Sequence, residues 1–254
     1  MLPDHLEPQL LSAAKAPPEG DGWLHEVKYD GYRLLCRMEH GRARLFTRRG
    51  SDWTGKLAKV AAAVERLGTG DAWLDGELVA LRPDGRPDFE ALHRAMAGRG
   101  GVRLAYQVFD VPYAAGRSLL EHGVLARKRV AEELVRGRCA EGIVRYTDHL
   151  VGSGPELLAH ARAAGLEGIV CKRAGSRYRP GTRSRDWLKV KAFHRYVFRV
   201  AGFTSDGLQL ADEAGAVVGS VYGGRTRTAP GDHVEVKALR WEPGRKLRHA
   251  VLLP

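Results

Sequence analysis

The pattern of secondary-structure signals changes near residue 193, and this change constrains the fold more than any other feature. Between residue 20 and Lys191, stretches that alternate with a period of two are mixed with stretches of helical spacing. Such a mixture favours sheets flanked by helices. After Lys191 the chain has only short alternating stretches, separated by glycine-rich turns. The sequence therefore predicts an α+β protein with two domains, residues 1–192 and residues 193–254.

The expected elements follow from periodicity and from turn residues. Residues 1–20 contain four prolines and no sustained period, so we expect an extended arm. Strands are expected at 23–28, 31–38, 42–47, 73–81, 102–111, 143–146, 166–172 and 186–191, the first three as successive antiparallel strands. Helices are expected at 54–67, 89–97, 118–135 and 154–164, with Asp88 and Ser118 as caps. In the second domain five short strands are expected, at 196–203, 207–211, 216–222, 232–239 and 247–253. They indicate a small closed barrel such as the oligonucleotide-binding (OB) fold.

The formal net charge of +11 is concentrated in the last third of the chain. Residues 172–254 contain 17 Lys and Arg against 7 Asp and Glu, a surplus of ten positive charges. A concentrated basic surface is the usual footprint of a polyanionic partner such as nucleic acid. The alternative is an arginine-rich surface that reflects only an arginine-rich genome.

Compartment signals point to the cytoplasm. No apolar run approaches membrane-spanning length, and the N-terminus lacks a charged-then-apolar signal pattern. The three cysteines, Cys36, Cys139 and Cys171, are odd in number and widely spaced. We therefore expect reduced thiols rather than a disulfide framework or a cysteine-based metal site.

The stretch from Glu26 to Arg33 carries the strongest chemical signal. It reads Glu-Val-Lys-Tyr-Asp-Gly-Tyr-Arg and places Lys28 between two expected strands, with Asp30-Gly31 as the turn. A lysine is protonated at neutral pH, and it becomes a nucleophile when burial or neighbouring cations lower its pKa. The alternative is a surface hairpin with ordinary charges.

Four further clusters of charged residues could act together with Lys28. They are Arg48, Asp75 with Glu77 on one strand face, Glu167 with Lys172, and Lys189 with Lys191 on another strand face. Two lysines on one face are costly inside a protein unless an anion lies between them, although on an exposed edge strand they would only protect the edge. A solvated ion pair is the alternative for Glu167 and Lys172. Together the clusters supply a nucleophile, cations for phosphates, and carboxylates for a divalent cation or a ribose, which suits attack of lysine on a nucleotide phosphate.

In these features the chain resembles the covalent nucleotidyltransferases, most closely the ATP-dependent DNA ligases. Within these it is similar to the ligase module of bacterial ligase D and its stand-alone relatives. Six ordered motifs carry the resemblance, namely Lys-Tyr-Asp-Gly-Tyr-Arg (28–33), Thr-Arg-Arg-Gly (47–50), Leu-Asp-Gly-Glu-Leu-Val (74–79), Val-Phe-Asp (108–110), Glu-Gly-Ile-Val-Cys-Lys (167–172) and Trp-Leu-Lys-Val-Lys (187–191). The resemblance extends from about residue 20 to the C-terminus.

The resemblance implies a DNA ligase that seals nicks in double-stranded DNA through AMP covalently attached to Lys28. It implies ATP as cofactor, Mg²⁺ or Mn²⁺ as metal, and a role in DNA repair, recombination or non-homologous end joining. Ku and a repair polymerase would be partners, and the protein would be a monomeric bacterial protein of the cytoplasm that joins the nucleoid when bound to DNA. The chain matches neither the amino-terminal DNA-binding domain of some ligases nor a polymerase or nuclease module.

The resemblance also implies residues that hold the adenine base. Glu26 and Val27 would recognise the base, Phe109 would stack on one of its faces, and Ile169 or Val170 would cover the other face.

The remaining implied roles concern the ribose, the phosphates and the metal. Glu77 would bind the ribose, and Arg33 would lie near the ribose or the nick phosphate. The phosphate-binding cations would be Arg48 for the 5′-phosphate of the nick, Lys189 and Lys191 for the α-phosphate, with Lys172 as a further cofactor-binding residue. Glu167 and Asp30 would support the metal, and Asp30 would also take part in catalysis.

The family's last motif is reduced here to Lys246-Leu-Arg248-His249, and Arg248 is its candidate for orienting the departing pyrophosphate. Other functions use related residues. An RNA ligase or a GTP-using capping enzyme shares the lysine motif, and a non-catalytic nucleic-acid-binding module would keep the basic barrel without the chemistry.

Overall fold

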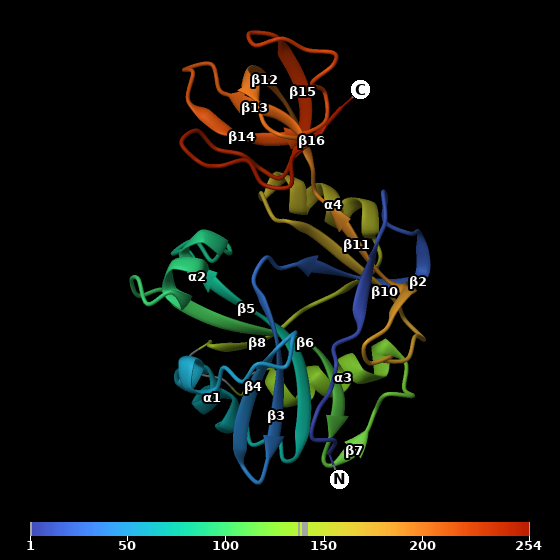
Figure 1. The fold of residues 1–254 in the computed structure, drawn as a ribbon. Coiled ribbons are helices and arrows are strands. Elements are labelled where there is room, and N and C mark those ends of the chain that lie inside the picture. The colour runs from blue at the N-terminus through green and yellow to red at the C-terminus, as the bar shows by residue number, and fades with distance from the viewer. Residues whose placement is uncertain (1, 137, 139–141, 254) are drawn as a thin grey trace. The chain divides into compact units, whose positions relative to one another are not determined.

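The computed structural model describes residues 2–136, 138 and 142–253, and the chain divides into two compact units (Figure 1). Met1–Leu157 with Ile169–Val190 forms the first unit, and Leu158–Gly168 with Lys191–Pro254 forms the second. The first unit combines sheets with helices, and the second consists mainly of strands. The expected α+β class is therefore confirmed, whereas the boundary after residue 192 stays a prediction.

A mixed sheet forms the lower part of the first unit (Figure 1). Its strand order is β4-β3-β5-β6-β7, with β8 parallel to β6. The bounds are β3 Tyr32–Glu39, β4 Arg42–Thr47, β5 Ala72–Leu81, β6 Arg103–Ala114, β7 Arg117–Ser118 and β8 Val144–Tyr146. The hairpin between β3 and β4 turns at His40 and Gly41, which both have positive φ angles, as the sequence predicts.

Helices cover one face of this sheet and close its main hydrophobic core. They are the 3₁₀ turn η1 Gly55–Leu57, α1 Ala58–Glu65, α2 Phe89–Met96 and α3 Val124–Val135. The opposite face is covered near its lower end by Leu2 and Leu6 of the N-terminal arm, which pack on Leu35 and Trp73. Because the sheet is covered on both faces, its central strand β5 is buried along almost its whole length.

The second sheet of the described first unit has the strand order β1-β11-β10-β2-β9. The bounds are β1 Leu10–Ala13, β2 Gly20–Lys28, β9 Leu150–Gly152, β10 Gly168–Arg173 and β11 Arg183–Lys191. The arm is thus not wholly extended and unpaired, because β1 pairs in parallel with β11. A strand of four residues that pairs with a partner more than 170 residues away leaves too weak a local signal to be recognised in the sequence.

The turn expected at Asp30-Gly31 is not a hairpin turn. Strands β2 and β3 belong to different sheets, and the segment that joins them crosses from one sheet to the other. It passes directly over β5, where a Cβ atom on Gly31 would lie 2.0 Å from the carbonyl oxygen of Leu78. Glycine is therefore needed here for close approach of two backbones rather than for a tight turn.

Of the two helix caps expected from the sequence, one is confirmed and the other is wrong. Asp88 caps α2, because its carboxylate accepts a hydrogen bond of 2.9 Å from the backbone N–H of Ala91. Ser118 caps no helix. It pairs with Tyr113 in the short strand β7, and α3 begins only at Val124. Of the cysteines, Cys36 and Cys171 are buried free thiols, and Cys139 lies outside the described residues.

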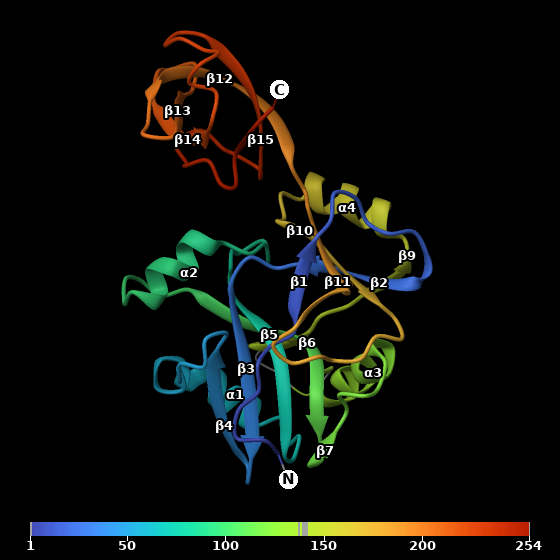
Figure 2. The same cartoon turned by 45° about the vertical axis from the view of Figure 1, so that its right-hand side comes forward.

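The second unit contains a curled antiparallel sheet with the order β14-β13-β12-β15-β16, consistent with an OB fold (Figure 2). Its strands are β12 His194–Phe203, β13 Gly207–Ala211, β14 Val217–Tyr222, β15 His233–Ala238 and β16 Val251–Leu252. The last strand is shorter than the expected 247–253, because Leu247 donates its backbone N–H to Val218 and His249 adopts a positive φ. Helix α4, Gly154–Ala163, spans the point where the chain passes from one unit to the other. Among the helices described, none is long and apolar enough to cross a membrane.

Candidate active site

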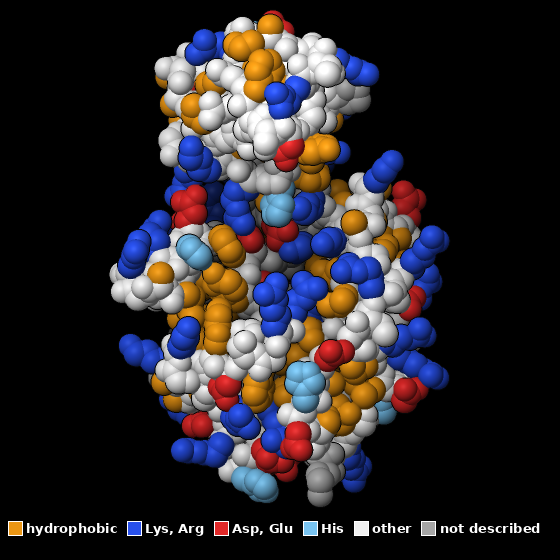
Figure 3. Space-filling view, viewed as in Figure 1, with side chains coloured by type: hydrophobic (Ala, Val, Ile, Leu, Met, Phe, Trp, Pro, Cys, Tyr) orange, Lys and Arg blue, Asp and Glu red, His pale blue; other side chains and the backbone are white. Residues whose placement is uncertain are grey.

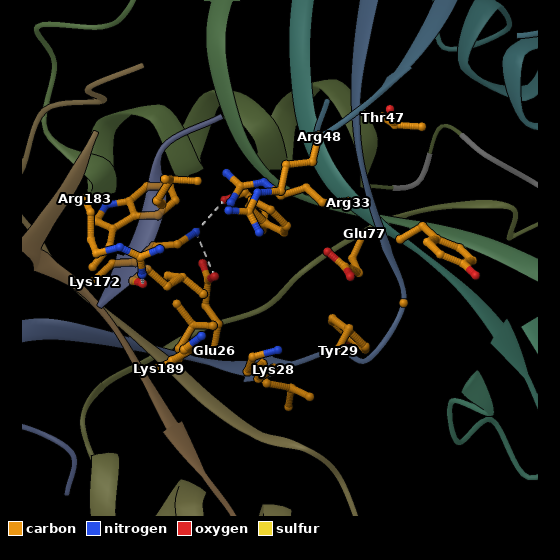
Figure 4. Close-up of a pocket in the computed structure, with 18 of the residues that line it drawn as sticks. Glu26, Lys28, Tyr29, Arg33, Thr47, Arg48, Glu77, Lys172, Arg183 and Lys189 are labelled. Carbon is orange, nitrogen blue, oxygen red and sulfur yellow. Dashed lines mark hydrogen bonds and ion pairs between the residues drawn. The ribbon is translucent and has the colours of Figure 1, made fainter. Parts of the chain in front are cut away.

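A pocket of about 820 Å³ in the first unit is lined by residues of both sheets (Figure 4). Many of the residues that the sequence singled out meet here, although they come from seven separate segments. They are Glu26, Val27, Lys28, Arg33, Arg48, Glu77, Phe109, Val170, Lys172 and Lys189. The folded chain thus assembles the six sequence motifs around a single cavity.

Some expected site residues do not line this pocket. Ile169 is completely buried in β10, so of the two alternatives for covering the adenine base only Val170 reaches the pocket. Asp30 lies in the crossing segment between Tyr29 and Gly31, which both line the pocket. Glu167, Lys191 and Arg248 belong to the second unit, and their expected roles stay predictions.

The nucleophile candidate lies on one wall of the pocket. Lys28 ends β2, Val170 lies on the neighbouring strand β10, and Lys189 lies on β11, the next strand of the same sheet. Arg33, Glu77 and Phe109 lie on β3, β5 and β6 of the other sheet. A ligand in the pocket would therefore have the lysines on one side, with a carboxylate, an arginine and an aromatic ring on the other.

The pocket is strongly basic. Among the described lining residues, seven carry a positive charge and two a negative charge; the cations are Lys28, Arg33, Arg48, Arg49, Lys172, Arg183 and Lys189. Lys and Arg side chains also border the hollow of the first unit in the space-filling view (Figure 3). Converging cations in a concave site attract an anion such as a nucleotide triphosphate, and they lower the cost of bringing it out of water.

Glu26 is held at the base of the pocket by two buried lysines. The Nζ of Lys172 lies 2.8 Å from one carboxylate oxygen of Glu26 (Figure 4), and the Nζ of Lys128 lies 2.5 Å from the other. Lys172 also donates to the carbonyl of Phe109 and stands over the rings of Phe109 and Trp187. Burial lowers the pKa of Lys172 from its ordinary value, while the charge of Glu26 opposes that shift.

Lys128 supports the pocket through its ion pair with Glu26, and it was not predicted from the sequence. It lies on α3, is completely buried, and donates a second hydrogen bond of 2.7 Å to the carbonyl of Thr147. Its burial could have been predicted from helical spacing, because Lys128 lies on the same face of α3 as Val124, Ala131 and Val135, and all four are buried. A lysine within an apolar helical stripe indicates a buried counter-charge, here Glu26.

Arg33 forms part of a second buried network. Its guanidinium makes two hydrogen bonds to the carboxylate of Asp75, of 2.8 and 2.5 Å, and a third of 2.7 Å to the carbonyl of Gln9. Although burial opposes it, the charge of Asp75 raises the pKa of Arg33, so the guanidinium is always charged. The expectation that Asp75 and Glu77 share a strand face is consistent with this geometry: Asp75 is buried against Arg33, and Glu77 reaches the pocket.

The aromatic wall is supported from behind by another buried ion pair. Phe109 packs below Arg33, whose guanidinium carbon lies 5.1 Å from the ring centroid. The next residue, Asp110, accepts hydrogen bonds of 2.7 and 3.0 Å from Arg127 of α3. Although burial opposes it, the Arg127 guanidinium lowers the pKa of Asp110 below its usual range. The Val-Phe-Asp motif therefore combines a ring that faces the pocket with a charge that anchors its strand.

Further residues line the pocket to which the sequence assigned no individual role, although six of them lie within the motifs 28–33, 47–50 and 187–191. They are Leu10, Leu11, Tyr29, Gly31, Tyr32, Thr47, Arg49, Ser51, Trp53, Arg183 and Trp187. Leu10 and Leu11 come from the arm, and Arg183 donates a hydrogen bond to the carbonyl of Leu11. Leu10 and Leu11 could not be placed from the sequence, because only the pairing of β1 with β11 brings them to the pocket.

The carboxylates and other metal-ligating side chains are spread over the fold. Within the described ranges, no group of three or more His, Cys, Asp or Glu side chains is placed to hold a metal ion. The expected ligands Asp30 and Glu167 belong to different units, and their role in holding a metal stays a prediction. In nucleotide sites Mg²⁺ is commonly bound by one or two carboxylates together with phosphate oxygens.

The chain is similar to known proteins over most of its length. The model of the ATP dependent DNA ligase domain matches residues 8–191. The multifunctional non-homologous end joining protein LigD of Pseudomonas aeruginosa is 42% identical over 203 residues, which are 80% of this chain and 24% of LigD. The SPbeta prophage-derived DNA ligase-like protein LigB of Bacillus subtilis is 32% identical, over 78% of this chain and 72% of LigB. The chain thus spans about a quarter of the length of LigD but most of the length of LigB.

A solved structure extends the similarity to the fold. The mycobacterial DNA ligase D complexed with ATP and MES superposes with a TM-score of 0.67 at 27% identity, covering 98% of this chain and 95% of that one. The match includes both units, because it leaves almost none of either chain uncovered. By the family model, by its relatives and by its fold, this chain belongs to the ATP-dependent DNA ligase domain family.

Proposed function

We propose that this protein seals nicks in double-stranded DNA at the expense of ATP, with Lys28 as the residue that carries AMP. The observation that carries the proposal is the position of Lys28 in a pocket that holds cations, a fixed carboxylate and an aromatic wall. A solvated surface lysine, the alternative from sequence, would not lie among converging cations and buried aromatic rings. Family membership supplies the reaction class.

The proposed reaction has three steps. The Lys28 amine loses a proton and attacks the α-phosphorus of ATP, so that a nitrogen–phosphorus bond forms and pyrophosphate leaves. An oxygen of the 5′-phosphate at the nick then attacks the same phosphorus, and lysine leaves. Finally the 3′-hydroxyl attacks the 5′-phosphate, which forms the phosphodiester bond and releases AMP. Most of the rate enhancement would come from in-line positioning and from cations that stabilise the developing charge.

The walls of the pocket suggest where each part of the nucleotide binds. Adenine would lie between Phe109 and Val170, with Glu26 at its edge. Each oxygen of Glu26 already accepts one lysine hydrogen bond, and a carboxylate oxygen can accept another. An exocyclic amino group could therefore still bind there. Glu77 would bind the ribose from β5.

Phosphate binding would fall to cations of the pocket. Lys189 would hold the α-phosphate beside Lys28, together with Lys191, and Arg48 would receive the 5′-phosphate of the nick. Lys172 would act indirectly, because its ammonium is engaged by Glu26 and by the carbonyl of Phe109.

The metal would be Mg²⁺ or Mn²⁺, bound together with the phosphates, and its ligands from this chain would be Asp30 and Glu167. When bound, it would neutralise phosphate charge during the transfer.

The proposed pathway rests on the relatives. LigD is named as a non-homologous end joining protein, and we infer a role in DNA repair by end joining for this chain. Nicked double-stranded DNA would be the substrate, with Ku and a repair polymerase as partners. The basic surplus of the last third would contact DNA phosphates.

The experiment is incubation with α-labelled ATP and a divalent cation, followed by denaturing electrophoresis. Wild-type protein should retain labelled AMP, whereas Lys28→Ala should retain none and still seal a nick that already carries 5′-linked AMP, because only the first two steps use the amine. Lys59→Ala removes an exposed lysine of α1 and is the matched control, which should behave as wild type. Labelled Lys28→Ala protein would show that another residue is the nucleophile. Labelling with GTP, or sealing of RNA in preference to DNA, would favour the capping enzyme or the RNA ligase.

A further inference from the structure

A closed ring of hydrogen bonds joins four distant segments of the chain beside the pocket. Tyr178, from the loop between β10 and β11, donates its hydroxyl hydrogen to Asp75 at 2.7 Å and accepts the backbone N–H of Gln9 at 3.2 Å. Asp75 pairs with Arg33, and Arg33 donates to the carbonyl of Gln9. The ring therefore returns to the residue at which it began.

The ring is almost completely shielded from water. Gln9 and Asp75 are 0% exposed, and Tyr178 is 2% exposed. Buried hydrogen bonds hold their geometry more rigidly than exposed ones, since breaking one leaves a polar group without a partner. Burial, and then the charge of Asp75, raises the pKa of Tyr178 well above its ordinary value, so the hydroxyl remains a donor.

The ring fixes a residue of the pocket wall. Hydrogen bonds to Asp75 and Gln9 use three of the five N–H groups of Arg33, and two remain for a ligand. The same guanidinium lies over Phe109, and the Tyr178 ring meets Trp187 edge to face with centroids 5.7 Å apart. Phe109, Trp187 and Arg33 all line the pocket. A shift of Tyr178 would therefore be transmitted to the groups that would contact the nucleotide.

The ring also ties the N-terminal arm to the site. Both backbone groups of Gln9 are members of the ring, and its side-chain oxygen accepts the N–H of Arg179 at 2.8 Å. The following residues, Leu10 and Leu11, line the pocket and begin β1, which pairs with the strand of Lys189. The arm is thus held at its point of entry into the site.

We propose that Tyr178 is a positioning residue for nucleotide binding, which acts by locking the backbone of Gln9 and the carboxylate of Asp75 so that Arg33 presents its two remaining N–H groups to the pocket. This inference rests on the proposed function, because it assumes that the ligand is the nucleotide of the AMP-transfer reaction. It assigns a role to the loop and to the arm, which contribute no catalytic group of their own.

The test compares two tyrosine-to-phenylalanine variants. Tyr178→Phe removes the hydroxyl from the ring and keeps the packing against Trp187. Tyr106→Phe is the matched control, since Tyr106 is also completely buried and its single hydroxyl hydrogen is shared between the backbone carbonyls of Leu34 and Leu74, which are not members of the ring. Both variants lose buried hydrogen bonds, so a loss of stability alone does not distinguish them.

Two measurements distinguish them. In AMP attachment at varied ATP concentration, Tyr178→Phe should raise KM for ATP about tenfold and change kcat little, as expected for the loss of one hydrogen bond to a charged network, whereas Tyr106→Phe should leave KM unchanged. Hydrogen exchange at the Gln9 amide should be faster in Tyr178→Phe only. Equal KM values for the two variants, or unchanged exchange at Gln9, would overturn the inference. Wild-type protein that takes up no AMP would refute the proposed function itself, and the exchange rates would still decide whether Tyr178 holds Gln9.

Discussion

The cluster of Glu26 with its two lysines allows a sharp prediction about stability. Two single substitutions remove different members of the same cluster. Glu26→Gln removes the anion and leaves two buried ammonium groups facing a neutral amide, whereas Lys128→Met removes one cation and leaves a balanced pair of Glu26 and Lys172, 2.8 Å apart. The two variants are close in shape to the wild type, so the difference between them is mainly one of charge.

The expected magnitudes differ because only one variant leaves uncompensated charge. All three side chains are at most 3% exposed, so water cannot compensate. Glu26→Gln should lower the free energy of unfolding by about 3–5 kcal/mol, the usual cost of breaking a buried pair by removing one partner. Lys128→Met should cost about 1–3 kcal/mol, because it removes a hydrogen-bond donor from Glu26 and from the carbonyl of Thr147 but leaves Glu26 and Lys172 as a balanced pair.

At alkaline pH the difference in the free energy of unfolding between Glu26→Gln and wild type should become smaller. Burial lowers the pKa of Lys172, and the charge of Glu26 opposes this shift more than any other group does. Without Glu26 the folded-state pKa falls further below the unfolded value. The folded variant then releases a proton that the unfolded chain retains, so its stability rises with pH relative to wild type.

The assay is urea unfolding of the three proteins at pH 7 and pH 9, at low and high salt. The difference between the variants should change little with salt, since the charges are buried. Equal losses for Glu26→Gln and Lys128→Met, or a gap that widens at pH 9, would refute the charge-balance reasoning.

Three further outcomes are expected. Arg248→Ala should slow AMP attachment from ATP by tenfold or more, since one charge-assisted contact contributes about 1.5–3 kcal/mol. The sealing of a pre-adenylylated nick should be spared. Equal losses in both assays would indicate that Arg248 contacts DNA or is needed for folding. Affinity for nicked DNA should fall steeply as salt rises from 50 to 200 mM in a titration, and a flat dependence would mean that the basic residues of 172–254 are only solvated surface. Burial lowers the pKa of His25 below its usual 6.5, so stability is lost as pH falls below that value, by at most about 1.4 kcal/mol per pH unit. His25→Phe should flatten the dependence between pH 7 and pH 5 in urea unfolding, and an unchanged slope would show that His25 does not titrate on unfolding.

Much of the site could be read from the sequence because its chemistry is concentrated in short motifs. Lys28 and Arg33 stand five residues apart, and Lys189 alternates with the buried Trp187 on one strand, so local periodicity was enough to group them. The cap at Asp88 and the turn at His40-Gly41 are likewise local, since each depends on the conformations of a few successive residues. Four of the five strands of the second unit were recognised for the same reason, whereas the strand expected at 247–253 is only Val251–Leu252.

Other features depend on contacts between distant segments, and local patterns do not contain them. The same residues that suggested a hairpin at Asp30-Gly31 form a crossing between two sheets, because Gly31 must pass over β5. The role of Gln9 could not be inferred, since its backbone acts through partners 24 and 169 residues away.

The sequence by itself contained the motifs that carry the resemblance to the DNA ligases, the candidate nucleophile and the change from a mixed α/β region to a region of short strands, because these are encoded in residue types and in periods of two and 3.6. Only the tertiary structure decided which charged residues reach the pocket and which support it from behind. Asp75 and Glu77 share a strand face, yet one is buried against Arg33 and the other faces the pocket. Lys128 and Lys172 both bind Glu26, although one comes from a helix and the other from a strand. The physical reason is that the energy of a buried charge depends on which opposite charge the fold places beside it. The distance between two residues along the sequence does not indicate whether they become such neighbours.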